Sequence, residues 1–276
     1  MRKIEKPTVK PIQLYVQFIV RSKEKIYKIM SKEYVYKYGR NVFLYNKKGI
    51  SKELYTVKSD LYLKEEMKYL YTVQMVDKHK KGRKVYNKIM SLAYLDICPF
   101  CGIGQVSTLD HYLPKSKFPI FSVLPYNLVP SCKDCNTGKG ISYAKTKAEQ
   151  TLHPYYDDFT TDQWLFAKVL RTSPISIEFF VDPPSDWDSI SKDRVEAHFV
   201  DYNLGRRFSI QASSELAKLN SGFSIRKFNF MQIKEQLDYE EQTYKKIHLN
   251  SWESALYQAL AESDWYCREG YNQNII

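Results

Sequence analysis

Apolar residues recur with helical spacing over most of the last third of the chain. Three segments carry this pattern and are predicted to be amphipathic helices, 209–219, 225–248 and 251–267. Ser251, followed by Glu253, is typical of the N-terminus of the last of them. Ahead of these helices, residues 175–181 have the sequence Ile-Ser-Ile-Glu-Phe-Phe-Val. This segment predicts a strand that ends in a turn at Pro183 and Pro184.

The first half of the chain carries shorter and more mixed patterns. Residues 33–45 combine aromatic and apolar side chains with lysine and arginine, which predicts strands. Residues 55–76 place apolar side chains at helical spacing, and residues 85–95 predict a short helix. The basic and polar run 77–84 between them predicts a loop. A further helix is predicted to follow Cys135 and to continue through residue 148.

Together these elements predict the α+β class. The chain of 276 residues is 43% hydrophobic and 26% charged, which is the composition of a globular protein with a buried core. We divide it into a basic N-terminal region (1–97), a central segment with the candidate chemistry (98–150) and a mostly helical C-terminal region (151–276). The most apolar run, 12–20, is shorter than the roughly 20 residues of a membrane-spanning helix. We therefore expect a cytoplasmic protein without membrane contact.

The charge of the chain is unevenly distributed. The net charge is +11, but residues 1–97 carry 23 basic and 9 acidic side chains, or +14, so the remainder carries −3. This asymmetry indicates either that the first region faces a polyanion such as nucleic acid, or that a lysine-rich surface merely aids solubility. The densest basic cluster consists of Lys78, Lys80, Lys81, Arg83 and Lys84. We predict that this cluster contacts nucleic acid.

Four of the five cysteines form two Cys-x-x-Cys pairs, Cys98 with Cys101 and Cys132 with Cys135, and 30 residues separate the pairs. Disulfides are rare in reducing compartments, so paired motifs of this kind indicate a metal. Four thiolates satisfy tetrahedral zinc and leave no open position, which predicts a structural zinc ion. Cys267 stands apart from these pairs, and we interpret it as a small buried hydrophobic residue.

Polar motifs surround and separate these pairs. They are Asp110-His111, Asn127-Leu128, and Cys132-x-x-Cys135-Asn136-x-x-Lys139. In their order and spacing, residues 98–144 resemble the HNH endonucleases, the zinc-knuckle branch of the His-Me-finger or ββα-metal nucleases. The resemblance implies a ββα-metal core that the zinc ion holds together, and it implies hydrolysis of phosphodiester bonds.

The resemblance also implies a role for each residue of these motifs. His111 would be the general base, which suits an imidazole whose unperturbed pKa is about 6.5. Asp110 and Asn136 would bind the catalytic cation, Mg²⁺ or Mn²⁺, through oxygen. Asn127 would brace the loop and orient His111. From its position alone, we predict that Lys139 contacts phosphate or balances charge.

The pattern leaves several alternatives open. The first hypothesis is a DNA-cutting enzyme, with RNA left open as a substrate. The second is a zinc-knuckle nucleic-acid reader without catalysis. The third is a subunit that a partner controls, since the chain also resembles the nuclease subunits of bacterial anti-phage systems such as Septu, in which the partner is an ATPase. His153 either packs behind the motif or approaches the metal, and we favour packing.

Overall fold

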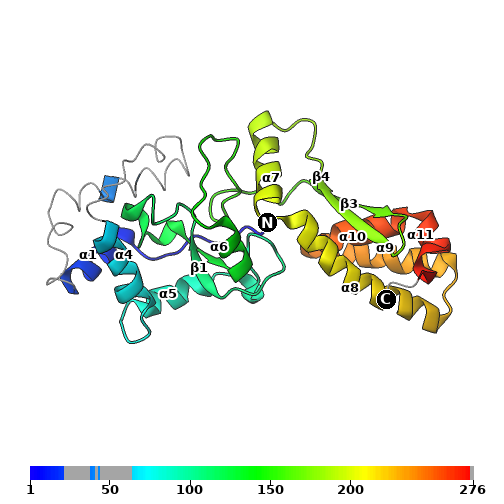
Figure 1. The fold of residues 1–276 in the computed structure, drawn as a ribbon, viewed down its shortest axis with the longest axis horizontal. Helices are drawn as coiled ribbons and strands as arrows, with labels where there is room; N and C mark the ends of the chain where they lie inside the picture. Colours follow the sequence, from blue (N-terminus) through cyan, green and yellow to red (C-terminus); the bar gives the residue numbers. More distant parts are fainter. Residues whose placement is uncertain (22–37, 41–42, 44–63, 274–276) are drawn as a thin grey trace. The chain divides into compact units, whose positions relative to one another are not determined.

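The computed structural model of the protein describes residues 1–21, 38–40, 43 and 64–273 (Figure 1). The chain forms two compact units, one made of Arg2–Asp157 and the other of Asp158–Ile276 together with Met1. Helices and two small sheets alternate along it, so the α+β class is confirmed. None of the helices in the described ranges has the length and apolar character needed to cross a membrane.

The unit Arg2–Asp157 contains a hairpin of two short strands, β1 (Thr108–His111) and β2 (Leu128–Ser131). The strands are antiparallel, and Asp110 and His111 lie opposite Val129 and Leu128. The helices described in this unit are α1 (Pro11–Arg21), α4 (Lys64–Tyr69), α5 (Arg83–Met90) and α6 (Lys133–Lys139). A seven-residue π-helix, η3 (Leu70–Val76), continues α4.

The hairpin is packed on two sides by helices from distant parts of the sequence. Helix α5 contacts both strands, and α6, which follows β2 directly, contacts β1. Both strands are almost completely buried, because they lie between these helices and the loop that joins β1 to β2. Two short 3-10 helices in that loop, η5 (Pro119–Phe121) and η6 (Pro125–Asn127), bring its apolar residues into the core. A strand pair followed by a helix is the order of elements that the resemblance implies for this segment.

The unit Asp158–Ile276 is a helical assembly around a second hairpin. Strand β3 (Leu165–Leu170) pairs antiparallel with β4 (Ser176–Val181). The helices are α7 (Ser189–Asp201), α8 (Leu204–Arg226), α9 (Phe230–Ile247), α10 (Trp252–Glu262) and α11 (Asp264–Arg268). Helix α8 packs on β4, and α10 packs on both β3 and α9. The apolar side chains of these contacts form the core of this unit.

The predicted elements of this unit are largely confirmed, with corrections at their ends. The strand at 175–181 is present as β4, and Ser251 caps α10 by accepting a hydrogen bond from the backbone N–H of Ser254. The segment 225–248 is not one helix, because Lys227 adopts a left-handed conformation that ends α8, and Asn229 begins α9 with a capping box. The segment 251–267 is also interrupted, at Ser263, which ends α10 and caps α11 by accepting a hydrogen bond from the backbone N–H of Tyr266.

Two predictions in the other unit are wrong. Most of the range 33–45, predicted as strands, lies outside the described residues, but residues 38–40 and 43 are helical. The helix predicted from Cys135 to residue 148 ends at Lys139, because Gly140 adopts a positive φ of 55° that stops the helix. Of the range 55–76, residues 64–76 are helical as predicted, and residues 55–63 lie outside the described residues.

Candidate functional site

The first cysteine pair lies on a tight turn before β1. The Gly102 N–H donates to the carbonyl of Cys98 at 2.8 Å, and the Cys98 N–H donates to the carbonyl of Gly104 at 2.8 Å. Gly102 has a φ of 74°, which a glycine adopts without strain. A Cβ on Gly104 would lie 2.7 Å from both Cβ and Sγ of Cys132. Glycine at 104 therefore lets the first pair approach the second.

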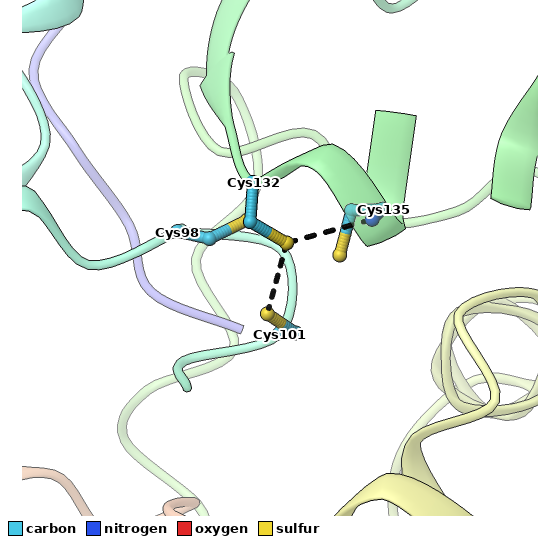
Figure 2. A group of neighbouring side chains, drawn as sticks. All are labelled: Cys98, Cys101, Cys132 and Cys135. Atoms are coloured by element: carbon cyan, nitrogen blue, oxygen red, sulfur yellow. Dashed lines mark hydrogen bonds between the residues drawn. The ribbon is translucent and has the colours of Figure 1, made fainter. Parts of the chain in front are cut away.

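The second pair lies where β2 passes into α6 (Figure 2). Cys132 is the N-cap residue of α6, and its Sγ accepts the backbone N–H of Cys135 at 3.4 Å. All four sulfurs lie within 4.8 Å of one another, and Cys101 and Cys132 Sγ are 3.8 Å apart. Four sulfurs bound about 2.3 Å from one ion at tetrahedral angles are about 3.8 Å apart. The cluster thus has the dimensions of a four-thiolate metal site.

The chemistry of the cluster also suits a metal ion such as zinc. All four side chains are buried, and the described residues show no disulfide among them. Hydrogen bonds among the thiols lower the pKa of Cys101, with that of Cys132 the largest cause, and raise the pKa of Cys98 and Cys135, with those of Cys101 the largest cause. The thiolate is the form that binds metal. The four cysteines could therefore hold one metal ion, as the sequence predicts.

Asp110 and Lys139 form a buried ion pair beside the hairpin. Lys139 Nζ lies 3.0 Å from Asp110 Oδ2 and donates a second hydrogen bond, 2.6 Å long, to the carbonyl of His111. Asp110 is only 3% exposed. Because Lys139 is the last residue of α6, this pair ties the end of the helix to the end of β1. Of the two roles predicted for Lys139, balancing charge matches its contacts.

His111 is buried next to this pair, with 7% of its surface exposed. Its Nε2 donates to the carbonyl of Ser122 at 2.9 Å, so the lone pair of the neutral ring is on Nδ1. The ring makes a T-shaped contact with that of Tyr71 in η3, with 4.4 Å between ring centroids. Burial, followed by the charges of Lys115 and Lys139, lowers the pKa of His111 to about 3. The imidazole is therefore neutral near pH 7, the form that accepts a proton.

The two motif asparagines have different surroundings. Asn127 is 0% exposed, its Oδ1 accepts the N–H of Leu113 at 2.8 Å, and its Nδ2 donates to the carbonyls of Leu113 and Phe121 at 3.0 and 3.3 Å. It braces the loop that carries Ser122. Asn136 lies one turn before Lys139 on the same side of α6. Its side chain makes no hydrogen bond or ion pair with any residue that the structure describes.

The basic cluster predicted to contact nucleic acid lies on the loop before α5 and on its first turn. Lys78, Lys80, Lys81 and Lys84 are exposed. Arg83 is engaged within the protein, because its guanidinium donates to the carbonyl of Val76 and to Asn87 and lies 4.4 Å from the ring centroid of Tyr86. Its contacts hold the loop against α5. The four lysines are thus the part of this cluster that is free to meet a polyanion.

His153 is buried and packs behind the motif. Its ring stacks on that of Tyr112 with 4.3 Å between centroids, and its Nδ1 accepts the backbone N–H of Tyr155 at 3.1 Å. These contacts support the packing interpretation, and they place His153 behind Tyr112, the residue that follows His111. Cys267 is buried in the other unit as expected, with Sγ 3.5 Å from the carbonyl of Leu260.

Three residues beside Asp110 and His111 were not found from the sequence. They are Tyr71, Lys115 and Ser122. Ser122 contributes only its carbonyl, which any residue type would supply. Tyr71 lies 40 positions before His111 in a segment whose apolar spacing indicates only a helix. Lys115 lies four residues after His111, and this closeness in sequence is the one feature from which its place beside the motif could have been predicted.

The fold and the site define an α+β protein with a four-cysteine cluster beside a buried Asp-His-Lys arrangement on a strand pair and helix. Comparison with the profiles of known protein families gives no match, and no solved structure matches the chain. Protein Ea31 of Escherichia phage lambda is 36% identical to this chain over 221 residues, which cover 74% of each protein. The chain therefore belongs to the family of this phage protein.

Proposed function

We propose that this protein is a metal-dependent HNH endonuclease that hydrolyses phosphodiester bonds in DNA. The observation that carries the proposal is the convergence of Asp110, His111 and Lys139 at one end of β1. A neutral histidine held by a backbone carbonyl, next to a carboxylate, can accept a proton from a water molecule bound beside it. The phage relative is compatible with a role in defence against phage, where an ATPase partner would control the enzyme.

In this proposal each residue has a separate task. Nδ1 of His111 accepts a proton from a water molecule while the water oxygen attacks phosphorus. The bond from phosphorus to the leaving sugar oxygen breaks, and that oxygen is protonated from solvent. Asp110 and Asn136 would hold Mg²⁺ or Mn²⁺, which supplies positive charge to the phosphate group. A zinc ion on the four cysteines would fix the segment before β1 to the start of α6, so that the reacting groups keep their separation.

The second candidate is a nucleic-acid reader without catalysis. The observation that favours it is the burial of Asp110 and His111, together with the neutralisation of Asp110 by Lys139. A reader would bind DNA through the exposed lysines and would cut nothing in any metal. The third hypothesis, an enzyme that a partner controls, predicts cleavage only after the partner is added.

A plasmid-nicking assay with Mg²⁺, Mn²⁺ or EDTA tests the proposal. We expect cleavage with either cation and none with EDTA. His111→Ala should slow cleavage by about 10²- to 10⁴-fold, the usual loss when a general base is removed. The matched control is His248→Ala, since His248 belongs to the other unit and is not one of the predicted site residues, and should leave cleavage unchanged. Wild-type protein that binds DNA but never cuts it, alone or with a neighbouring gene product, would exclude the enzyme and favour the reader.

A further inference from the structure

Lys115 and the candidate catalytic histidine, His111, contact the same aromatic ring. The ammonium nitrogen of Lys115 lies 4.6 Å from the ring centroid of Tyr71, and the same ring makes the T-shaped contact with His111. The side chain is half-buried. Tyr71 therefore holds a positive charge at a fixed place beside the imidazole, although Lys115 itself lies on an irregular loop.

The charge of Lys115 has no carboxylate partner among the described residues, and the ring of Tyr71 is its contact. Lys139 is paired with Asp110, and Lys68 is paired with Glu65 at 3.0 Å. No carboxylate among the described residues lies within ion-pair distance of Lys115. Burial and the nearby charge of Lys68 both lower the pKa of Lys115, and Asp110 acts in the opposite sense. A partly desolvated cation with this surplus of positive neighbours is stabilised when an anion binds to it.

The anion that fits is a phosphate group. We propose that Lys115, held on the ring of Tyr71 beside His111, binds a non-bridging oxygen of the phosphodiester that the site receives. A lysine ammonium binds phosphate as a compact point charge, without the fixed geometry of an arginine fork. This inference rests on the proposed function for the identity of the substrate, but phosphate binding at Lys115 can be measured without any cleavage.

Lys117 is the matched control. It lies two residues further along the same loop and is exposed, and its side chain makes no hydrogen bond or ion pair with any described residue. The intact protein is treated with a lysine-acylating reagent in inorganic phosphate or in chloride at equal ionic strength, and acylation of each lysine is quantified by mass spectrometry. We expect phosphate to protect Lys115 and to leave Lys117 unchanged. Equal acylation of Lys115 in both salts would overturn the inference, whether or not the wild type cuts DNA.

Variants give the corresponding measurement on DNA. The dependence of duplex affinity on salt is measured without added divalent cation for Lys115→Met and Lys117→Met. Loss of one phosphate contact lowers the slope of log affinity against log salt by about 0.9. We expect this loss for Lys115→Met and partial or full recovery with Lys115→Arg, which keeps the charge. If Lys115→Met and Lys117→Met have the wild-type slope while the wild type still cuts plasmid, only the role of Lys115 is wrong. If the wild type cuts nothing but phosphate protects Lys115, the anion site stands and the nuclease proposal fails.

Discussion

Replacing Asn127 with alanine should lower the stability of the protein far more than the same change at Asn136, the other asparagine of the motif. The side chain of Asn127 is fully buried and makes three hydrogen bonds to the backbone of the loop between β1 and β2. Each such bond contributes about 1 kcal/mol, so Asn127→Ala should lower the free energy of unfolding by about 3 kcal/mol. Asn136→Ala should change it by less than about 0.5 kcal/mol, since this side chain makes no bond within the described structure.

The assay is urea denaturation of both variants and the wild type, followed by far-ultraviolet circular dichroism. A loss of about 3 kcal/mol corresponds to a fall in melting temperature of roughly 6 to 12 °C for a protein of this size. Cleavage activity should distinguish the two variants in a different way. Asn136→Ala should raise the concentration of Mg²⁺ needed for cleavage at unchanged stability, whereas Asn127→Ala should lose activity together with its fold. A loss below about 1 kcal/mol for Asn127→Ala, or equal losses for the two variants, would refute this reasoning.

Further predictions concern the metal, the hairpin and the basic loop. Elemental analysis should find about one zinc per chain. Gly104→Ala should reduce this zinc content, because the added Cβ would lie 2.7 Å from Cys132, and an unchanged zinc content would contradict the reasoning. Stripping zinc with a chelator should lower the melting temperature, since metal binding contributes folding free energy, and readdition should restore it. Tyr155→Phe should cost about 1 kcal/mol in urea denaturation, because it removes the 2.7 Å hydrogen bond to the carbonyl of Leu128. Changing the exposed lysines to glutamine should flatten the salt dependence of DNA binding by a few units and leave zinc content alone, and a slope equal to that of the wild type would favour an acidic protein partner. These lysines are Lys78, Lys80, Lys81 and Lys84.

The parts of the site that could be predicted are those with a local signal in the sequence. The cysteine pairs could be found because a Cys-x-x-Cys turn sets the sulfur positions within four residues. The structure brings these pairs together, as expected. The position of the helix that follows Cys132 could be predicted, but its length could not, because the positive φ of Gly140 depends on the turn that follows it. The helical residues 38–40 show that aromatic and apolar composition is a weak guide where tertiary contacts decide.

The contacts that complete the site could not be predicted from the sequence. The pairing of Lys139 with Asp110 joins residues 29 positions apart, and Tyr71 reaches His111 across 40 positions. Such contacts depend on how α4 and η3 pack against the hairpin, and apolar spacing indicates only that a helix has a buried face. The roles of His111 and Asn136 remain predictions, and the nicking assay and the metal titration are their tests.

The π-helix η3 makes the length of its segment, as well as its residue types, important for the site. Hydrogen bonds in a π-helix join residues i and i+5, whereas those in an α-helix join residues i and i+4. Each hydrogen-bonded turn of η3 therefore spans one residue more than a turn of an α-helix. Removing a single residue between Tyr71 and Val76 would allow an ordinary α-helix to form. Because each residue of an α-helix turns the chain by about 100°, the side chains on either side of the deletion would then rotate relative to one another by about that angle. Tyr71 could not keep its contact with His111 while α5 kept its contact with the hairpin. Among relatives of this chain, insertions and deletions between α4 and α5 should therefore be rarer than substitutions.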